Sequence, residues 1–153
     1  MLQARVPNVR FVVAGRNPSP ALCRWLAGIP GVEVTGTVSD MRAEVAKATV
    51  CVVPLRLGSG TRLKILEAGG MAKAVISTSI GAEGLDLVNG EEIVLADEPS
   101  EFAEAVTCLI TDANLRASIG RAAQIRVLKD YSIHALRAAL SSALSQFAQL
   151  KKS

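Results

Sequence analysis

The chain has 153 residues, of which 50% are hydrophobic and 20% are charged, and its formal net charge is +3. These values are typical of one globular domain with a hydrophobic core and exclude a disordered chain. Aromatic residues make up only 3% of the chain, and apart from Arg62 with Lys64 and the terminal pair Lys151 and Lys152 the basic residues are scattered. The sequence therefore gives no indication of nucleic-acid binding.

The three cysteines fit neither a disulfide framework nor a metal site. Cys23, Cys51 and Cys108 are odd in number and far apart in the sequence, so we expect them to act as small buried hydrophobic residues. No apolar run approaches the roughly 18 residues of a membrane-spanning helix. Residues 1–5 also lack the apolar region of a signal peptide. We therefore expect a cytoplasmic protein.

Apolar runs alternate with helical patterns along the chain. The apolar runs predict strands at residues 9–14, 32–38, 50–55, 74–78 and 92–96. The helical patterns predict helices at 21–27, from about 40 to 48, with Ser39 or Asp40 as the cap, and from about 61 to 71. The pair Gly69-Gly70 should weaken the end of the last of these helices by roughly 1 kcal/mol per glycine. Strands separated by helices predict an α/β fold, a Rossmann-like parallel sheet with helices on both faces.

Helical patterns also fill the C-terminal part, from about residue 99 to 150. Pro99 opens the first predicted helix, and Asp112 and Ser132 are suited to cap the next two. The last helix carries an apolar stripe of Leu136, Leu140, Leu144 and Phe147. Its polar face has few cations, which favours packing against protein over a membrane surface. No linker or repeat divides the chain, so residues 1–153 are predicted to form one domain.

The stretch 50–67 (VCVVPLRLGSGTRLKILE) carries the clearest chemical pattern. A buried strand ends in a glycine-rich turn that enters a helix, which places free backbone N–H groups where they can hold a phosphate. The sequence lacks the Gly-Lys-Ser/Thr of a P-loop, the third glycine of a dinucleotide fingerprint and the acidic strand ends of a phosphoacceptor receiver. The plain alternative is a tight turn in which Thr61 caps a helix.

Four motifs carry a resemblance to a known family. They are Gly15-Arg16-Asn17-Pro18, 34–40 (VTGTVSD), 54–68 (PLRLGSGTRLKILEA) and 77–85 (STSIGAEGL). In this order they resemble the C-terminal, donor-binding half of a GT-B glycosyltransferase of the GT4 type, also called group 1. The likeness extends through residues 96–99 to Tyr131 and Ser132 and so covers nearly the whole chain.

The resemblance implies a retaining glycosyltransferase that takes its sugar from a nucleotide-diphospho-sugar and needs no metal or other cofactor. The sequence has no Asp-x-Asp metal motif, which agrees with this expectation. Polysaccharide assembly is the usual setting of such enzymes, with possible peripheral membrane association of the complete enzyme. By the same resemblance the donor would be bound by Gly15, Arg16, Thr37, Val38, Gly58, Ser59, Gly60, Thr61, Arg62, Lys64 and Glu67.

The resemblance also assigns roles to these residues. The backbone of the turn 58–61 would hold the phosphates, with Arg62 and Lys64 as counter-charges or, alternatively, as ordinary solvated residues. Glu67 would accept hydrogen bonds from the ribose hydroxyls. Thr37 and Val38 would border the base, and Gly15 and Arg16 would face the diphosphate. The lone His134 is expected to be a surface or capping residue, and the sequence names no catalytic residue.

This chain also departs from the family pattern. Ser59 stands where many relatives carry the first glutamate of a pair, and Ala72 and Ala74 stand where relatives tend to have glycine and proline. The family's first strand of this half and the whole acceptor-binding half have no counterpart, so we expect a truncated domain with a gap at the centre of its sheet. Alone it would bind donor without turnover. A non-catalytic nucleotide-binding or interaction module and a truncated remnant are the alternatives.

Overall fold

The computed structural model describes residues 2–58 and 60–150, without the side chains of residues 149 and 150. Ser59, predicted to contact the donor phosphates, and the basic pair Lys151 and Lys152 lie outside the described residues.

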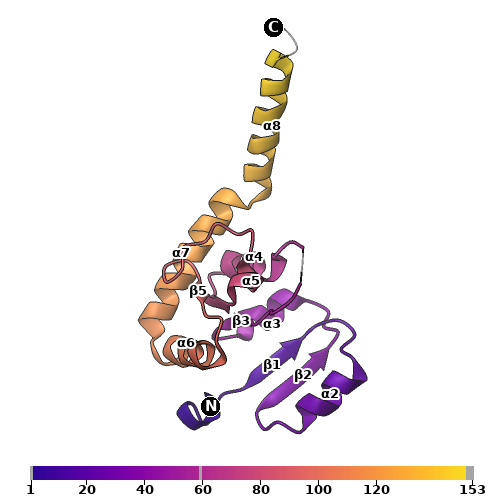
Figure 1. Ribbon diagram of the computed structural model, residues 1–153, viewed down its shortest axis with the longest axis vertical. Helices are drawn as coiled ribbons and strands as arrows, with labels where there is room; N and C mark the ends of the chain where they lie inside the picture. Colours follow the sequence, from indigo (N-terminus) through magenta and orange to yellow (C-terminus); the bar gives the residue numbers. More distant parts are fainter. Residues whose placement is uncertain (1, 59, 151–153) are drawn as a thin grey trace.

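The strands form two separate parallel sheets (Figure 1). One pairs β1 (Phe11–Ala14) with β2 (Val32–Gly36). The other has the order β3-β4-β5, formed by β3 (Cys51–Val53), β4 (Val75–Ser77) and β5 (Val94–Leu95). The predicted α/β class and the parallel pairing are confirmed. The expected gap lies between β1 and β3, which pair with each other nowhere among the described residues.

A short helix precedes the first strand, further helices lie between the strands, and the last helices close the chain. They are α1 (Leu2–Arg5), α2 (Pro20–Ala27), α3 (Met41–Lys47), α4 (Leu63–Gly70), α5 (Ser79–Ala82), α6 (Pro99–Thr111), α7 (Ala113–Asp130) and α8 (Ile133–Leu150). The carboxylates of Asp40 and Asp112 accept hydrogen bonds from backbone N–H groups two and three residues later, and the hydroxyl of Ser132 does the same for Ala135. These contacts confirm the predicted caps of α3, α7 and α8.

The sequence did not predict α1 and α5. Gly81 and Gly84 are residues that favour a turn. The side chain of Thr78 instead accepts a hydrogen bond from the N–H of Gly81, 2.9 Å away, and so caps a one-turn helix. Gly81 is needed for close packing, since a Cβ there would lie 2.9 Å from the carbonyl oxygen of Val53.

The hydrophobic core lies on both faces of the three-stranded sheet. Successive side chains of a strand point to opposite faces, and on β4 Val75 packs with Ile65 of α4 while Ile76 packs with Leu109 of α6. All four side chains are almost completely buried. Helix α4 therefore covers one face and α6, with the start of α7, covers the other.

Two glycines allow α4 and α7 to approach each other closely. A Cβ on Gly69 would lie 3.1 Å from Val127 Cγ2, and a Cβ on Gly120 would lie 2.2 Å from the carbonyl oxygen of Ala72. Residues 69–70, predicted to weaken the end of the helix, therefore form the surface against which α7 packs. Helix α4 includes both glycines and ends at Gly70. Just beyond it Ala72 has a φ of 56°, a left-handed conformation that favours glycine.

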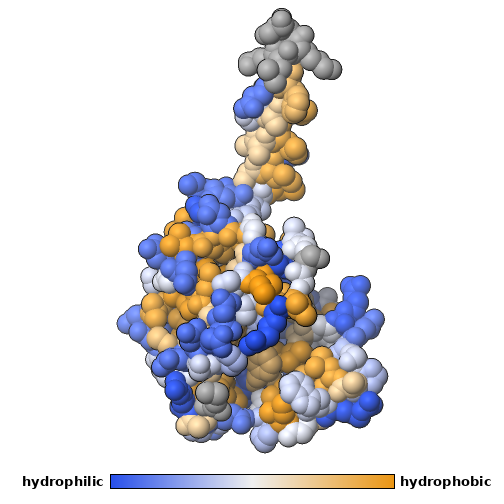
Figure 2. All heavy atoms as spheres, viewed as in Figure 1, coloured by the Kyte–Doolittle hydropathy of each residue, from blue (hydrophilic) through white to orange (hydrophobic). Residues whose placement is uncertain are grey.

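Helix α8 extends away from the body of the molecule (Figure 1). Its predicted apolar stripe lies along one side of the helix and is exposed (Figure 2). The exposed hydrophobic side chains of α8 are Ile133, Leu136, Leu140, Leu144 and Phe147. Among the described residues, no helix combines the length and the apolar character that crossing a membrane requires.

The prediction that the cysteines are buried is wrong for Cys108, which is exposed. Cys23 and Cys51 are only partly buried. Cys108 lies on the outer side of α6 because Val106 and Leu109 occupy the inner side of the same helix. Burial raises the pKa of the Cys51 thiol, so this thiol stays protonated at neutral pH.

Candidate functional site

The glycine-rich turn joins the carboxyl end of β3 to the start of α4. Gly58 has a φ of 141° and Gly60 a φ of 100°, conformations that side-chain-bearing residues rarely adopt. Helix α4 begins at Leu63 with Arg62 as its cap residue, and no side chain of the described residues caps it. The alternative interpretation of the sequence, a tight turn in which Thr61 caps the helix, is not what the structure shows. Thr61 lies before the helix and does not cap it.

The first turn of α4 leaves backbone donors open. The earliest amide of α4 that bonds to a described residue is that of Ile65, which donates to the carbonyl of Arg62 at 3.0 Å. The amides of Leu63 and Lys64 precede it and have no carbonyl of the same helix within reach. These amides thus have no hydrogen-bond partner among the described residues, and the positive end of the helix dipole lies beside the glycine turn.

Arg62 is turned into the protein. Its side chain is only 6% exposed, and its Nη2 lies 3.2 Å from Oε2 of Glu83 and 3.4 Å from the carbonyl oxygen of Gly58. Its Nε has no hydrogen-bond partner among the described residues. The structure therefore places this predicted counter-charge behind the turn, where it holds the carbonyl of Gly58 and faces α5.

Lys64 and Glu67 lie on the outer face of α4. They are one helical turn apart, so they share a face, while Ile65 and Ala68 point into the core. The ion pairs among the described residues include neither Lys64 nor Glu67. An exposed cation and an exposed carboxylate thus stand next to the open amides of the same helix.

The remaining predicted residues gather at the end of the two-stranded sheet. Ala14 pairs with Gly36 in the register of β1 and β2, and the N–H of Gly15 donates to the carbonyl of Gly36 at 3.3 Å. Gly15 and Arg16 are therefore brought beside Thr37 and Val38, with Arg16 and Thr37 exposed. No hydrogen bond or ion pair within the described part of the chain joins this group to the group on α4.

Polar residues that the sequence analysis did not select lie at the carboxyl ends of β4 and β5. Ser79, at the start of α5, donates its N–H and its hydroxyl to the Asp97 carboxylate at 2.8 and 2.6 Å. Hydrogen bonds from the hydroxyl and then the amide of Ser79 lower the pKa of Asp97, with a smaller contribution from the charge of Arg56. The sequence did contain a signal for this contact. Ser79 and Asp97 each directly follow a predicted strand, and parallel strands end at the same edge of a sheet.

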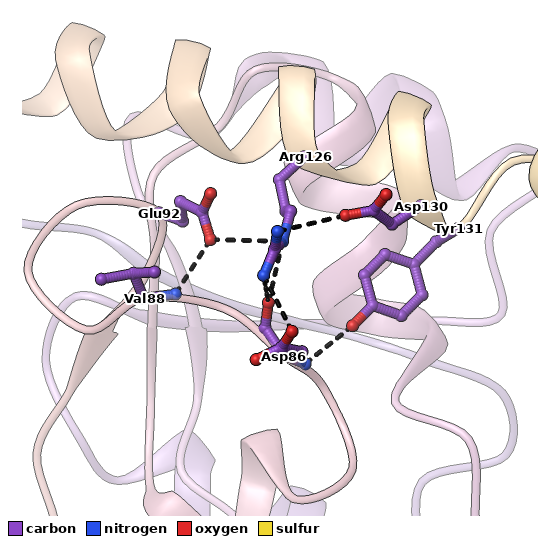
Figure 3. Close-up of polar contacts among 6 residues, drawn as sticks. All are labelled: Asp86, Val88, Glu92, Arg126, Asp130 and Tyr131. Carbon is purple, nitrogen blue, oxygen red and sulfur yellow. Dashed lines mark hydrogen bonds and ion pairs between the residues drawn. The ribbon is translucent and has the colours of Figure 1, made fainter.

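A second polar cluster fastens the segment between α5 and β5 to α7 (Figure 3). Arg126 lies 3.0 Å from the Asp86 carboxylate, 3.2 Å from that of Asp130 and 3.7 Å from that of Glu92, and its Nε also donates to the Asp86 carbonyl at 2.9 Å. The Tyr131 hydroxyl accepts the N–H of Asp86 at 2.7 Å. This segment leads into the amino end of β5, opposite the edge that carries the glycine turn, so the cluster serves the fold.

No metal-binding arrangement is found in the described residues, where three or more histidine, cysteine or acidic side chains nowhere gather to hold an ion.

Comparison with known proteins finds one family model that matches most of the chain. The family model described as "Glycosyl transferases group 1" matches residues 1–112. An uncharacterized 44.6 kDa protein in the cps region of Klebsiella pneumoniae is 37% identical over 107 residues, which cover 65% of this chain and 28% of that protein.

Solved structures show the same fold at low sequence identity. The C-terminal domain of a group 1 family glycosyl transferase from Francisella tularensis superposes with a TM-score of 0.61 and 23% identity, over 74% of this chain and 60% of that one. Sucrose-phosphate synthase from Thermosynechococcus elongatus superposes with a TM-score of 0.77 and 18% identity, over 97% of this chain and 41% of that one. The chain thus spans 28% of the curated relative and less than two thirds of each solved one.

Proposed function

Because the chain belongs to the group 1 glycosyl transferase family, we propose that it is the donor-binding domain of a retaining, GT4-type enzyme that uses a nucleotide-diphospho-sugar. The observation that supports this proposal is the amino end of α4. Amides without a partner among residues 2–58 and 60–150, a glycine turn in left-handed conformations, an exposed lysine and an exposed glutamate occur together there.

The diphosphate would lie against this helix end. A helix N-terminus stabilises an anion by about 0.3 to 1 kcal/mol, and by up to about 2 kcal/mol in a partly buried site. Lys64 adds a full positive charge in the first turn. In transfer, the bond between the sugar and the diphosphate breaks and negative charge grows on the departing phosphate oxygen, so amides and a cation fixed at this place stabilise the leaving group. This arrangement supplies the charge stabilisation from the chain itself, in keeping with the metal-independent reaction that we propose.

Glu67 is suited to hold the ribose. It lies four residues beyond Leu63, which corresponds to about 6 Å along the helix axis. That offset is suitable for a sugar attached to a phosphate bound at the helix end. A carboxylate can accept hydrogen bonds from two neighbouring hydroxyls at once, and no ion pair with a described residue competes for it.

The residues at the end of the two-stranded sheet would complete the site. Thr37 and Val38 would border the base through their backbone, and Gly15 and Arg16 would face the phosphates. In this proposal the chain supplies the donor side of the reaction. The acceptor and the groups that contact it belong to other parts of the enzyme, so the isolated chain binds donor without turning it over.

Thermal unfolding with a panel of UDP-, GDP- and ADP-sugars tests the proposal. A ligand at about 100 times its dissociation constant stabilises the folded state by about 2.7 kcal/mol. We expect one nucleotide class to raise the melting temperature of the wild-type chain and of Glu91→Ala, a matched change of an exposed glutamate between α5 and β5. Glu67→Ala should lose the shift. If no nucleotide shifts a cooperative transition, or if both variants respond alike, the proposed site is wrong.

A further inference from the structure

Helix α8 carries an apolar stripe that its own chain leaves exposed. Every residue from 136 to 148 is exposed, and the helix extends away from the body of the molecule (Figure 1). The large side chains of the stripe are each at least 55% exposed, and they are Ile133, Leu136, Leu140, Leu144 and Phe147. Most of the stability of a helix in a protein comes from the packing of its apolar face. Helix α8 therefore needs a partner.

The stripe is symmetric about its middle residue. Leu136 and Leu144 lie four positions before and after Leu140, and Ile133 and Phe147 lie seven positions before and after it. Both offsets are close to whole numbers of helical turns, so the five side chains lie on one side of the helix. Two antiparallel copies related by a two-fold axis at Leu140 would match apolar residue to apolar residue along the whole stripe. The stripe is thus complementary to itself.

The charges on α8 favour this antiparallel pair. The helix contains no aspartate or glutamate, and its basic residues are His134 and Arg137. A parallel pair would place the two Arg137 side chains at the same level, whereas the antiparallel pair places Arg137 of one copy opposite Ala143 of the other. It also brings the positive amino end of each helix dipole beside the negative carboxyl end of the other helix. A membrane surface would instead favour a polar face rich in lysine and arginine.

The position of α8 leaves room for a second copy. The helix has 18 residues, which corresponds to a length of about 27 Å. Its carboxyl end points away from both sheets (Figure 1). In an antiparallel pair the bodies of the two copies therefore lie at opposite ends of the paired helices.

We infer that residues 133–147 of α8 form a homodimer interface, in which a second copy of this chain lies antiparallel with Leu140 at the two-fold axis. Leu136 of each copy packs against Leu144 of the other, and Ile133 of each packs against Phe147 of the other. The pair supplies the packing that α8 lacks in a single copy. The inference goes beyond the proposed nucleotide site, since it concerns other residues and has a different readout.

Sedimentation equilibrium of the whole 153-residue chain tests the dimer at concentrations from about 1 μM to about 1 mM. We expect the mass to rise with concentration from 16.0 kDa, the mass of one chain, to twice that value. Leu140→Glu places two carboxylates opposite each other and should weaken the dimer at least about hundredfold. Trp25→Ser changes a residue of α2 that is 68% exposed and should leave the dimer unchanged.

Mixtures of oppositely charged variants test the symmetry of the pair. Leu140→Lys alone should also be monomeric, but an equal mixture of Leu140→Glu and Leu140→Lys should dimerise, because opposite charges then meet at the axis. Dimerisation in the mixture also shows that both variants are folded. An antiparallel pair further predicts that Leu136→Glu dimerises with Leu144→Lys and not with Leu136→Lys, which a parallel pair would favour.

A wild-type chain that stays at 16.0 kDa over the whole concentration range would overturn the inference. Flotation of that monomer with phosphatidylcholine vesicles would then assign the stripe to a membrane surface, and absence of flotation would assign it to a further part of the enzyme. A dimer that Leu140→Glu leaves intact, or dimerisation of Leu136→Glu with Leu136→Lys, would equally contradict the antiparallel pair.

Discussion

The guanidinium of Arg62, at the start of α4, meets the carboxylate of Glu83, at the end of α5, with 3.2 Å between Nη2 and Oε2. The two side chains are in very different environments, because that of Arg62 is 6% exposed and that of Glu83 is 74% exposed. The same nitrogen reaches the carbonyl of Gly58 at 3.4 Å. Arg62 thus connects the glycine turn to a second helix on its inner side, while Lys64 is exposed on the outer side.

Loss of this anchor should loosen the turn without unfolding the domain. Because Glu83 is exposed, Glu83→Gln should change the free energy of unfolding by less than about 1 kcal/mol. Arg62→Met keeps an apolar body in place of the buried charge, which is often nearly neutral for stability. Both variants should speed amide exchange at Gly58 and Gly60, measured by NMR. Lys64→Met serves as the control, and equal acceleration in that variant would show that Arg62 does not anchor the turn.

Ala72→Gly should stabilise the protein by roughly 1 kcal/mol. Ala72 has a φ of 56°, and an L-residue with a Cβ costs about 1 to 2 kcal/mol in that conformation relative to the right-handed one. The control is Ala43→Gly on the exposed face of α3, which should destabilise by about 1 kcal/mol. Chemical denaturation of the three proteins measures both effects. A loss of stability in Ala72→Gly would contradict the left-handed assignment.

The cluster around Arg126 should make a graded contribution to stability. Tyr131→Phe removes one hydrogen bond to the Asp86 amide and should cost about 1 kcal/mol. Arg126→Met should cost more, because it removes contacts to Asp86, Glu92 and Asp130 together. Arg121→Met changes an exposed arginine on the same helix and should be nearly neutral. Urea unfolding would count against the role of the cluster if Arg126→Met and Arg121→Met proved equally stable.

Asp97 should make stability depend on pH. The Ser79 hydrogen bonds lower the pKa of Asp97 in the folded state, so the carboxylate contributes its full stabilisation at neutral pH and loses it as the pH falls through the lowered pKa. Asp97→Asn should therefore melt below the wild type at neutral pH, and the difference should shrink in acid. Melting curves from pH about 7 to about 3 measure this. A difference that stays constant over this range would contradict the assignment.

The sequence predicts the elements of this fold better than the contacts between them. Periodicity places every strand within a few residues, and the side chains of Asp40, Asp112 and Ser132 cap the helices where they are expected. Local patterns suffice there because a cap and its partner lie within three residues. The burial of Arg62 was not predictable in this way, since it depends on Glu83, 21 positions further along the chain.

The candidate site was likewise predictable only where it depends on residues close together in the sequence. The glycine turn and the face that carries Lys64 and Glu67 follow from local spacing. The contact between Ser79 and Asp97 spans 18 positions and arises only when β4 and β5 pair. The apolar spacing on α6 likewise indicates a buried face, but only the packed structure shows that Cys108 lies outside it.

The most direct measurement of the central claim is the location of bound nucleotide on the chain. Amide chemical shifts should be recorded by NMR while the nucleotide-sugar that stabilises the chain is titrated in. The proposed donor site predicts the largest changes at Gly58, Gly60 and the amides of residues 61–64, with smaller changes at Gly36 to Val38. Changes confined to other parts of the chain, or none at saturating nucleotide, would contradict the donor-binding function.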